Sequence, residues 1–585
     1  MHGTRMVKFA YTVAQVSRVD CHTVADWQLG SRKQSSSCAR SKFLRDARFT
    51  GPCRKPKRIF SIFSSKTGQV VSSEVDFVKF EVIPPNRPKV VIVGAGWAGL
   101  SALYHLSKQK GYDVTLLEAG KAVGGLVAGW REGRKPVEAG IHGFWQQYHN
   151  IFALFDEIGI SPLTDLADVS QYSPQGLEAI WPVFEKQQPL LPAPFGSLAY
   201  TQFLNLPVQE RMKALGLLFP VLDFDYSDEG WKRYDKISAR DLFKQFGVSE
   251  RLIQEAFDPM LLTGLFAPAE LCSSAAATGM AYFFVLGHQR SFDVRWCRGT
   301  VAEKIFQPWL SRIDHYGGQV ETGARVSDVT LGPRNTVTEV VCEDGRRFPA
   351  DAVVFATGIS ALQKIVTSSP ALQSRSEFLD VMNLRAVDAV AVRLWFDRKV
   401  YVPRAANACY GFDPTVGWTF FDLTSLHDEY RDAEGSVIEA DFYNCSQFLP
   451  MSDQAITARV HRYLEKCVPG FREANVIDST ILRLPRAVSH FFPGSYQHIP
   501  KAETSFSNVF LAGDWIKDNE HGSWSQEKAY VTGLKASNLV INKLGQGDPA
   551  RILPVEPDEP HIELGRNALK SLRNLSSSIN LPLPF

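Results

Sequence analysis

The chain has 585 residues, of which 45% are hydrophobic and 22% charged, and its formal net charge is +2. This composition fits one large two-part enzyme or several small domains, and it excludes a fibrous or disulfide-dense chain. The nearly neutral total argues against a dedicated nucleic-acid binder, and none is expected as a partner. The charge is unevenly spread, because residues 1–70 hold 14 Lys and Arg but only three acids.

The basic excess marks an N-terminal leader. Between residues 32 and 66 the chain is rich in Ser, Lys and Arg, with one acid and no apolar periodicity. A secretory signal would need an apolar block of roughly 7 to 15 residues, and none is present. We therefore predict that residues 1–75 are a transit peptide or disordered leader, with organelle import favoured over a merely disordered basic tail.

The sequence does not support a membrane-spanning protein, a zinc site or a disulfide framework. No run approaches the roughly 18 to 20 apolar residues that span a bilayer, so a soluble or monotopic protein is expected. The nine cysteines include no CxxC pair. Cys21, Cys38 and Cys53 lie in the predicted leader, the other six are interpreted as reduced core cysteines, and no metal site is predicted.

A dinucleotide-binding motif opens the folded part. Residues 89–93 (KVVIV) form a β-branched run typical of a buried parallel strand. The following GAGWAGL begins an apolar-periodic helix near residues 98–108. Its glycines permit a tight turn, a close approach of backbone to pyrophosphate, and packing of helix on strand: Gly94, Gly96 and Gly99.

An acid completes this motif. A second predicted strand, residues 113–117, ends in Glu118, whose carboxylate can accept both ribose hydroxyls of an adenosine. A glycine-rich turn also occurs for packing alone, but strand, helix, strand and acid in this order predict a dinucleotide. The pair Gly124 and Gly125 lets a further loop approach the phosphates, which favours FAD over NAD.

Distant segments complete the same domain. A helix is predicted over residues 301–313, with a kink at Pro308, and a strand over residues 352–356. Near the C-terminus a strand over residues 509–512 leads into Gly513 and Asp514, and a helix begins at about residue 525. An acid at this place can bond ribityl hydroxyls, while the helix N-terminus stabilises the electron-rich edge of a flavin.

These motifs together resemble the FAD-dependent amine-oxidase and carotenoid-desaturase superfamily, and most of all the plant and cyanobacterial phytoene and zeta-carotene desaturases. The resemblance covers about residues 89–544. It is carried by GxGxxG with Glu118 and Gly124-Gly125, the segment leading to Val326, AGD at 512–514 with 525–533, and the stretches 138–145, 148–160 and 191–194.

The fold expected from the motifs and the resemblance is α/β with an α+β second domain. A Rossmann-like FAD-binding domain is assembled from the discontinuous segments 86–160, 296–358 and 508–545. A substrate domain comprises residues 161–295 and 359–507. Residues 546–585 are predicted to be a Pro-rich linker and tail with one short docking helix around Ile562 to Leu572.

The resemblance implies roles for single residues. It places Glu118 on the adenosine ribose, Val326 near the adenine, Asp514 on the ribityl chain and residues 138–145 beside the isoalloxazine ring. The whole expected cofactor-binding set is Gly94, Gly96, Gly99, Glu118, Gly124, Gly125, Val326, Gly513, Asp514 and Glu527.

Two positions depart from the family pattern, and one histidine is ambiguous. Leu126 stands where a basic residue is usual, so a phosphate contact must come from elsewhere. Lys528 stands where Gly is usual and is expected to crowd the start of the helix. His142 either touches flavin or substrate or is a packed structural histidine.

The predicted function is that of a plastid FAD oxidoreductase acting on an apolar polyene or isoprenoid by desaturation or isomerisation. A flavin supplies the hydride acceptor, so no catalytic acid–base pair is required. FAD is expected to be non-covalent, because no Cys lies between residues 509 and 544. A flavin amine oxidase and a non-catalytic or regulatory flavoprotein are the alternatives.

Partners and location follow from the same resemblance. Plastoquinone, with O2 as runner-up, is the expected electron acceptor, since no second GxGxxG is framed by a strand and a helix. The expected place is the plastid stroma, or the periphery of the thylakoid or envelope membrane. Residues 190–222 either rest on a membrane surface or form a buried helix pair.

Aromatic residues of the substrate domain either line a long apolar tunnel or form ordinary core. The candidates are Phe203, Phe224, Tyr282, Phe283, Phe284, Trp395, Trp418, Phe420 and Phe421.

Overall fold

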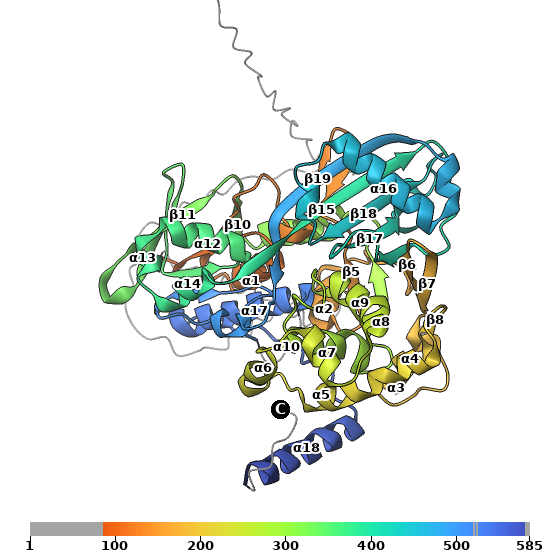
Figure 1. Ribbon diagram of the computed structural model, residues 1–585. Helices are drawn as coiled ribbons and strands as arrows, with labels where there is room; N and C mark the ends of the chain where they lie inside the picture. The colour runs from red at the N-terminus through yellow and green to blue at the C-terminus, as the bar shows by residue number, and fades with distance from the viewer. Residues whose placement is uncertain (1–85, 519–520, 522–523, 579–585) are drawn as a thin grey trace, which may run out of the picture. The chain divides into compact units, whose positions relative to one another are not determined.

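The computed structural model describes residues 86–518, 521 and 524–578, all of which belong to one compact unit, Glu81–Phe585. The predicted leader, residues 1–75, lies outside the described residues. Two sheets organise the described part of the chain, and they are visible in different regions of Figure 1.

The first is a five-stranded parallel sheet in the order β10-β2-β1-β14-β20. Its central strands are buried along almost their whole length because helices cover the sheet, which explains their uninterrupted apolar sequence. The strands come from three separate stretches of sequence: β1 (Lys89–Val93), β2 (Asp113–Leu117), β10 (Gln319–Glu321), β14 (Ala352–Phe355) and β20 (Val509–Leu511).

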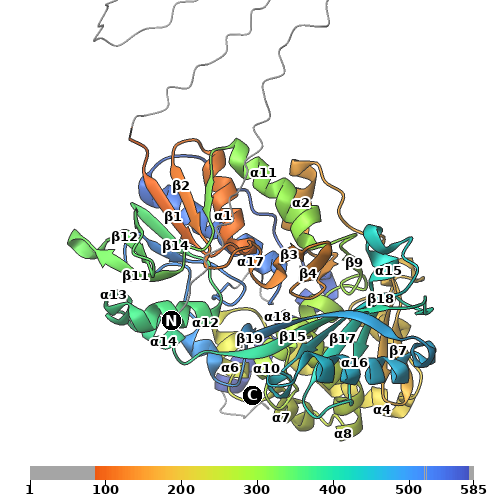
Figure 2. The ribbon, with the colours of Figure 1, turned by 90° about the horizontal axis from the view of Figure 1, so that it is seen from above.

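Two helices that begin at this sheet pack closely against each other (Figure 2). They are α1 (Trp97–Lys108) and α17 (Gln526–Leu544). A Cβ atom at Gly533 of α17 would lie 2.1 Å from the carbonyl oxygen of Ala98, so only glycine permits this approach. Helix α2 (His149–Ile158) lies beside α17 and contributes to the same core.

The helix predicted over residues 301–313 is divided into two parts. A π-helical turn over Ala302–Phe306 precedes α11 (Gln307–His315), and Pro308 lies in the first turn of α11. Proline lacks an N–H and fits best in the first helical turn, which explains the break. A three-stranded sheet follows, with β11 (Val326–Leu331), β12 (Val337–Cys342) and β13 (Arg347–Pro349).

The second large sheet has eight strands in the order β19-β15-β18-β17-β16-β6-β7-β8, antiparallel except where β16 meets β6. Helix α16 (Asp453–Cys467) covers one of its faces (Figure 1). The strands are β6 (Val169–Ser173), β7 (Gly176–Trp181), β8 (Gln202–Phe203), β15 (Arg385–Phe396), β16 (Ala406–Cys409), β17 (Gly417–Asp422), β18 (Val437–Tyr443) and β19 (Val476–His490).

Short helices make up much of the chain outside the two sheets. They include α3 (Phe195–Tyr200), α4 (Val208–Met212), α5 (Leu218–Asp223), α6 (Asp228–Tyr234), α7 (Ala239–Gln245), α9 (Asp258–Gly264), α10 (Ser274–Ala281), α12 (Ile359–Ser368), α13 (Pro370–Gln373) and α14 (Ser376–Val381).

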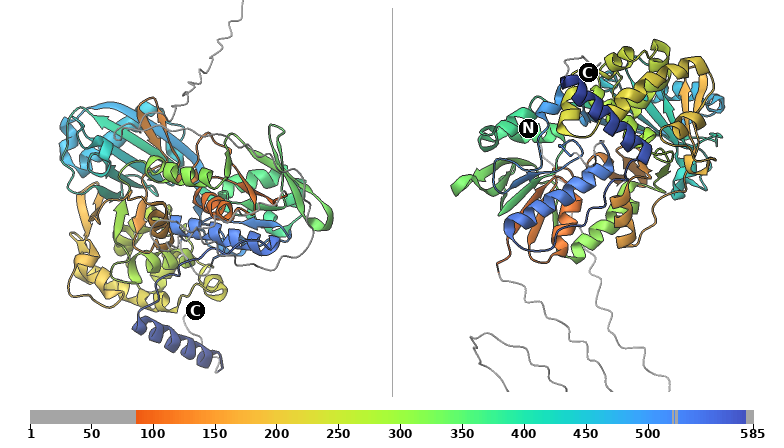
Figure 3. Two further views of the ribbon diagram at one scale, coloured as in Figure 1. Left: turned by 180° about the vertical axis from the view of Figure 1, so that it is seen from behind. Right: turned by 90° about the horizontal axis from the view of Figure 1, so that it is seen from below.

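The C-terminal tail contains a longer helix than the sequence indicates. Helix α18 (Pro560–Ser578) packs against α5, and Figure 3 shows it beside the yellow helices in two views. Ile562 is its buried anchor, in contact with a small cluster that includes Ala193 and Tyr282.

The expected α/β fold with an α+β second part is confirmed, because a Rossmann-like parallel sheet built from distant segments stands beside a separate mixed sheet. The residue bounds given to the two domains stay a prediction.

Candidate functional site

A cavity of about 640 Å³ joins the two sheets, within the range of roughly 300 to 1,000 Å³ that small-molecule sites occupy. The loops that follow the parallel strands β1, β2, β14 and β20 line one end of it. In open α/β sheets, ligands bind at this edge of the sheet. The predicted site residues on its lining are Gly94, Gly96, Glu118, Gly124, Gly125, His142, Val326, Gly513 and Asp514.

Two glycine loops face each other at the nucleotide end. A Cβ at Gly96 would meet only the Cα of Gly125, 3.9 Å away, so the space in front of it is open. Gly124 and Gly125 both have positive φ, 128° and 58°, which favours glycine. The N-terminus of α1 has no side-chain cap and opens into this space, so its N–H groups are available to an anion.

Gly99 differs from Gly94 and Gly96, the other glycines of the motif, in its surroundings. It does not line the cavity, and a Cβ there would lie 1.8 Å from the carbonyl oxygen of Gly94. Gly99 therefore serves the packing of α1 on the preceding turn rather than a ligand contact.

The Glu118 carboxylate is held at the end of β2 by two backbone N–H groups. Ala95 donates to it at 2.9 Å and Gly120 at 2.6 Å. These bonds keep the carboxylate on the cavity wall, where a ribose would present its hydroxyls.

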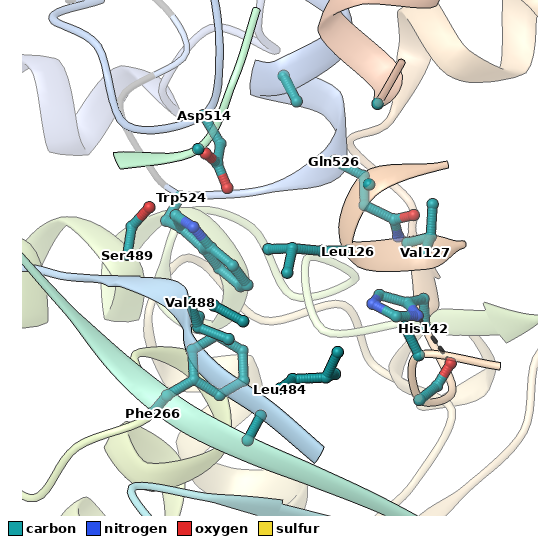
Figure 4. Close-up of a pocket in the computed structure, with 18 of the residues that line it drawn as sticks. Leu126, Val127, His142, Phe266, Leu484, Val488, Ser489, Asp514, Trp524 and Gln526 are labelled. Atoms are coloured by element: carbon teal, nitrogen blue, oxygen red, sulfur yellow. Dashed lines mark hydrogen bonds between the residues drawn. The ribbon is translucent and has the colours of Figure 1, made fainter. Parts of the chain in front are cut away.

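Asp514 faces the cavity from the loop after β20 (Figure 4). Burial raises the pKa of its carboxyl to about 6, while the positive charge of Lys528 acts in the opposite direction. The preceding Gly513 has a φ of 144°, and its N–H donates to the Thr532 hydroxyl at 2.9 Å, which fixes the turn.

The two departures from the family pattern have different surroundings. Leu126 lines the cavity (Figure 4), so an apolar side chain stands where a phosphate-binding cation is usual. Lys528 is only 6% exposed and does not line the cavity. Burial lowers the pKa of Lys528, and the carboxylates of Asp518 and Asp514 oppose that shift.

Glu527 lies outside the cavity lining, in contrast to the prediction that it contacts the cofactor. Its carboxylate accepts hydrogen bonds from the backbone N–H groups of Asn150 (2.8 Å) and Ile151 (3.0 Å) and from the Asn150 amide (2.7 Å). The sequence shows an acid at the start of a helix, but it does not show whether that acid binds a ligand or accepts hydrogen bonds from another helix. Here it accepts them from the N-terminal N–H groups of α2.

His142 lines the cavity, and its Nδ1 lies 3.0 Å from the carbonyl oxygen of Gly140 (Figure 4). Burial lowers the pKa of the imidazole to about 4, so the ring is neutral at pH 7. A carbonyl can only accept, so Nδ1 carries the proton and Nε2 is left as an acceptor.

Gln526 connects three segments at the cavity wall, a role that the sequence motifs do not indicate. Its side-chain oxygen accepts from the indole N–H of Trp97 at 2.9 Å, and its amide donates to the carbonyl of Gly143 at 2.9 Å. The residue therefore ties α1, α17 and the loop of His142 together at the cavity wall. Only the three-dimensional fold brings these partners, hundreds of residues apart, into contact.

Most of the aromatic residues proposed for a tunnel belong to the core. Phe284 and Phe421 line the cavity, whereas Trp418 and Phe420 lie in the core cluster beneath α16. The other members of the proposed set pack elsewhere. The aromatics that do line the cavity include Trp145, Trp181, Trp296, Trp524, Phe266, Phe292 and Tyr443.

The residues at the nucleotide end fit FAD. The open space beside Gly96 and the uncapped start of α1 suit a pyrophosphate, and carboxylates at Glu118 and Asp514 stand where ribose and ribityl hydroxyls are expected. When bound, FAD supplies a hydride acceptor. The chain binds and orients the reactants and excludes water from between them.

Comparisons with known proteins identify the family of this chain. The family model of flavin-containing amine oxidoreductases matches residues 97–541. The 15-cis-phytoene desaturase of an Oncidium hybrid is 27% identical over 78% of this chain and 79% of its own length. The enzyme of that name from Synechococcus elongatus is 25% identical over 77% of this chain and 96% of its own length.

Solved structures share the fold. Cyclohexylamine oxidase from Brevibacterium oxydans superposes with a TM-score of 0.59 at 16% identity, over 79% of this chain and all of its own. A putrescine oxidase bound to putrescine gives 0.56 at 15% identity, over 78% of this chain and 99% of its own. The chain therefore belongs to the flavin-containing amine oxidoreductases and is an FAD-dependent oxidoreductase.

Proposed function

We propose that the chain removes hydrogen from, or isomerises, an apolar polyene of the isoprenoid class, with FAD held non-covalently. The observation that carries the proposal is the continuity of the cavity from the glycine loops to the open face of the eight-stranded sheet. On two of its strands, β15 and β16, small side chains leave room for a long apolar molecule: Ala389, Ala391, Ala406 and Ala408.

The relatives named as phytoene desaturases support a polyene over an amine, because they are 26–27% identical to this chain over 78% of its length. The amine oxidases are similar in fold alone, at 14–16% identity. The test is to incubate the FAD-loaded protein with phytoene, zeta-carotene and a set of primary amines and to analyse the products. A polyene with an added or isomerised double bond supports the proposal, whereas an aldehyde and ammonia from an amine support the alternative.

Non-covalent FAD is consistent with the positions of the cysteines. The six described cysteines are buried, and none of them lines the cavity. Precipitation with acid is expected to release all the flavin from the polypeptide, and flavin that remains attached would contradict this part of the proposal.

A membrane surface is the proposed source of the apolar substrate. None of the described helices is long and apolar enough to cross a bilayer. Yet large apolar side chains are exposed in two neighbouring places, the segment of residues 190–215 and helix α18. They are Leu190, Phe195, Leu198, Leu204, Val208, Met212, Leu215, Leu564, Leu572 and Leu575.

This exposed surface lies next to the cavity wall. The hydroxyl of Ser197, on α3, donates to the carbonyl of Val285 at 2.5 Å, and Val285 lines the cavity. We propose that a substrate dissolved in the membrane enters the cavity from this side. The plastid names of the plant relatives favour a plastid membrane.

The electron acceptor is proposed to be a plastid quinone, with O2 as the second candidate. The acceptor must reach the cavity, since the sequence has no further dinucleotide motif. Reduced protein mixed anaerobically with a short-chain plastoquinone, O2 or NADP⁺ should be reoxidised by the quinone. Fast reoxidation by NADP⁺ alone would overturn this part of the proposal.

A further inference from the structure

Three of the polar side chains that line the cavity lie together on its floor. They are Thr419 on β17 and Asp441 and Tyr443 on β18, and all three line the cavity. Thr419 and Asp441 are directly opposite in the strand register, and the Tyr443 hydroxyl lies 3.1 Å from the Thr419 hydroxyl. A pure hydrocarbon would cover these groups without offering a hydrogen bond, which is unfavourable.

Asp441 has an unused oxygen. The residue is 4% exposed, and its Oδ2 accepts the N–H of Ile141 at 2.9 Å. Its Oδ1 has no hydrogen-bond partner in the described part of the chain. A Cβ at Gly140 would lie 3.1 Å from the Asp441 carboxyl carbon, so the glycine keeps room for this carboxyl group beside the loop of His142.

Asp441 forms no ion pair within the described part of the chain. Arg393 is buried and donates to Glu439 at 2.5 Å and to Glu138 at 3.1 Å, and both of these carboxylates are buried as well. Two acids thus share the single guanidinium, and no described ion pair reaches Asp441. Burial raises the pKa of Asp441 well above its ordinary value, and the negative charge of Glu439 adds to the effect.

A neutral Asp441 is a hydrogen-bond donor. In the protonated form, which burial favours, Oδ2 accepts from Ile141 and the proton lies on Oδ1, the oxygen without a partner. One of the Tyr443 and Thr419 hydroxyls donates to the other, and the O–H group that remains is a second donor on the same floor. Such a group of neutral donors in an apolar floor matches an acceptor oxygen on an otherwise apolar ligand.

We propose that Asp441, Tyr443 and Thr419 form a binding site for the carbonyl oxygen of an apolar ligand in this cavity. The carbonyl belongs either to a quinone that reoxidises the flavin or to a keto group of an isoprenoid substrate. The inference rests on the proposed function only in taking the cavity's ligand to be apolar.

The test measures ligand binding to the oxidised holoenzyme by quenching of its tryptophan fluorescence, because Trp296 and Trp524 line the cavity. The probes are duroquinone, β-ionone as a keto isoprenoid, and squalene as a hydrocarbon without oxygen. The variants are Asp441→Leu, Asp441→Asn and Tyr443→Phe, each checked for flavin content and circular dichroism.

We expect Asp441→Leu to weaken binding of the carbonyl probe roughly tenfold and Tyr443→Phe to weaken it about threefold, within the range for one hydrogen bond. Asp441→Asn retains a donor and should bind within about twofold of the wild type. Squalene offers these groups no hydrogen bond, so its binding should not weaken in any variant. A response to duroquinone assigns the site to the electron acceptor, and a response to β-ionone assigns it to the substrate.

The inference is overturned if Asp441→Leu binds both carbonyl probes as the wild type does, or if Asp441→Asn is as weak as Asp441→Leu. Should Asp441→Leu fail to fold, Tyr443→Phe decides, since unchanged binding of both carbonyl probes would also overturn it. Flavin reduction by a polyene is recorded separately on the same wild-type sample. If no polyene reduces the flavin, the proposed function is contradicted. The carbonyl-binding result still supports or overturns the inference by itself.

Discussion

Glu527 and Asn150 are 377 positions apart in sequence, yet the carboxylate of the first accepts both the backbone N–H (2.8 Å) and the side-chain amide (2.7 Å) of the second. The Asn150 amide also pairs with the backbone of Leu553 in the C-terminal tail, at 2.7 and 3.0 Å. One buried acid thus joins the start of α17, the start of α2 and the tail.

Replacing Glu527 with Ala should therefore affect stability more than flavin binding. The variant leaves buried donors at the start of α2 without an acceptor, which costs about 1 to 3 kcal/mol of unfolding free energy. Denaturant unfolding measures this loss, and flavin content after purification should stay near that of the wild type. A colourless variant with wild-type stability would assign Glu527 to the cofactor instead.

Gly96 and Gly99 should respond in opposite ways to the same substitution. Gly96→Val fills open space, so the protein folds but loses FAD because the side chain occupies the place of the pyrophosphate. Gly99→Val forces atoms to within 1.8 Å of the Gly94 carbonyl and should prevent folding. Circular dichroism and flavin absorbance of the two purified variants separate these effects. A yellow Gly96→Val protein with unchanged FAD affinity would contradict the site.

FAD affinity should depend on the protonation of Asp514. A ribityl hydroxyl donates more strongly to a carboxylate than to a neutral acid, so binding favours the deprotonated form. With the pKa of Asp514 near 6, affinity falls as the pH drops through about 6 and levels off above about 7. Titration of the apoprotein with FAD between pH 5 and 8 measures this.

Asp514→Asn is the matched control for that pH dependence. It should bind FAD more weakly at pH 8, and its affinity should change much less between pH 5 and 8 than that of the wild type. A variant with the same pH profile as the wild type would show that another group titrates.

Charge placed on the exposed apolar surface should weaken membrane binding without changing the fold. Leu564 is 70% and Leu572 55% exposed on α18, so Leu564→Glu with Leu572→Glu removes apolar contact area at little cost in stability. Flotation with galactolipid vesicles should show less bound protein for this pair of substitutions. Equal flotation of wild type and variant would exclude α18 from the membrane-binding surface.

The nucleotide end of the site is predictable from sequence because its determinants are local. A strand, a glycine turn and a helix are adjacent in the chain, and the acid at Glu118 follows the next strand. The expected segments correspond to β1, α1 and β2 within one residue at each end. The role of Gly99 is separable from that of Gly96 only in three dimensions, where one faces backbone and the other faces open space.

The substrate end is not predictable in the same way. Every residue of β17 is buried, since α16 covers one face of the sheet and the cavity wall lies on the other. The sequence GWTFFD therefore does not reveal that Thr419 and Phe421 face the cavity while Trp418 and Phe420 face the core. Asp441 joins the site only because β18 pairs with β17 in a particular register.

The central claim, that this cavity brings an apolar polyene to FAD, is tested most directly by the anaerobic loss of flavin absorbance. The purified yellow protein is mixed without oxygen with phytoene or zeta-carotene in detergent, and in parallel with primary amines at matched concentration. The account predicts that a polyene bleaches the flavin and that the amines do not. Bleaching by an amine with none by either polyene would contradict it.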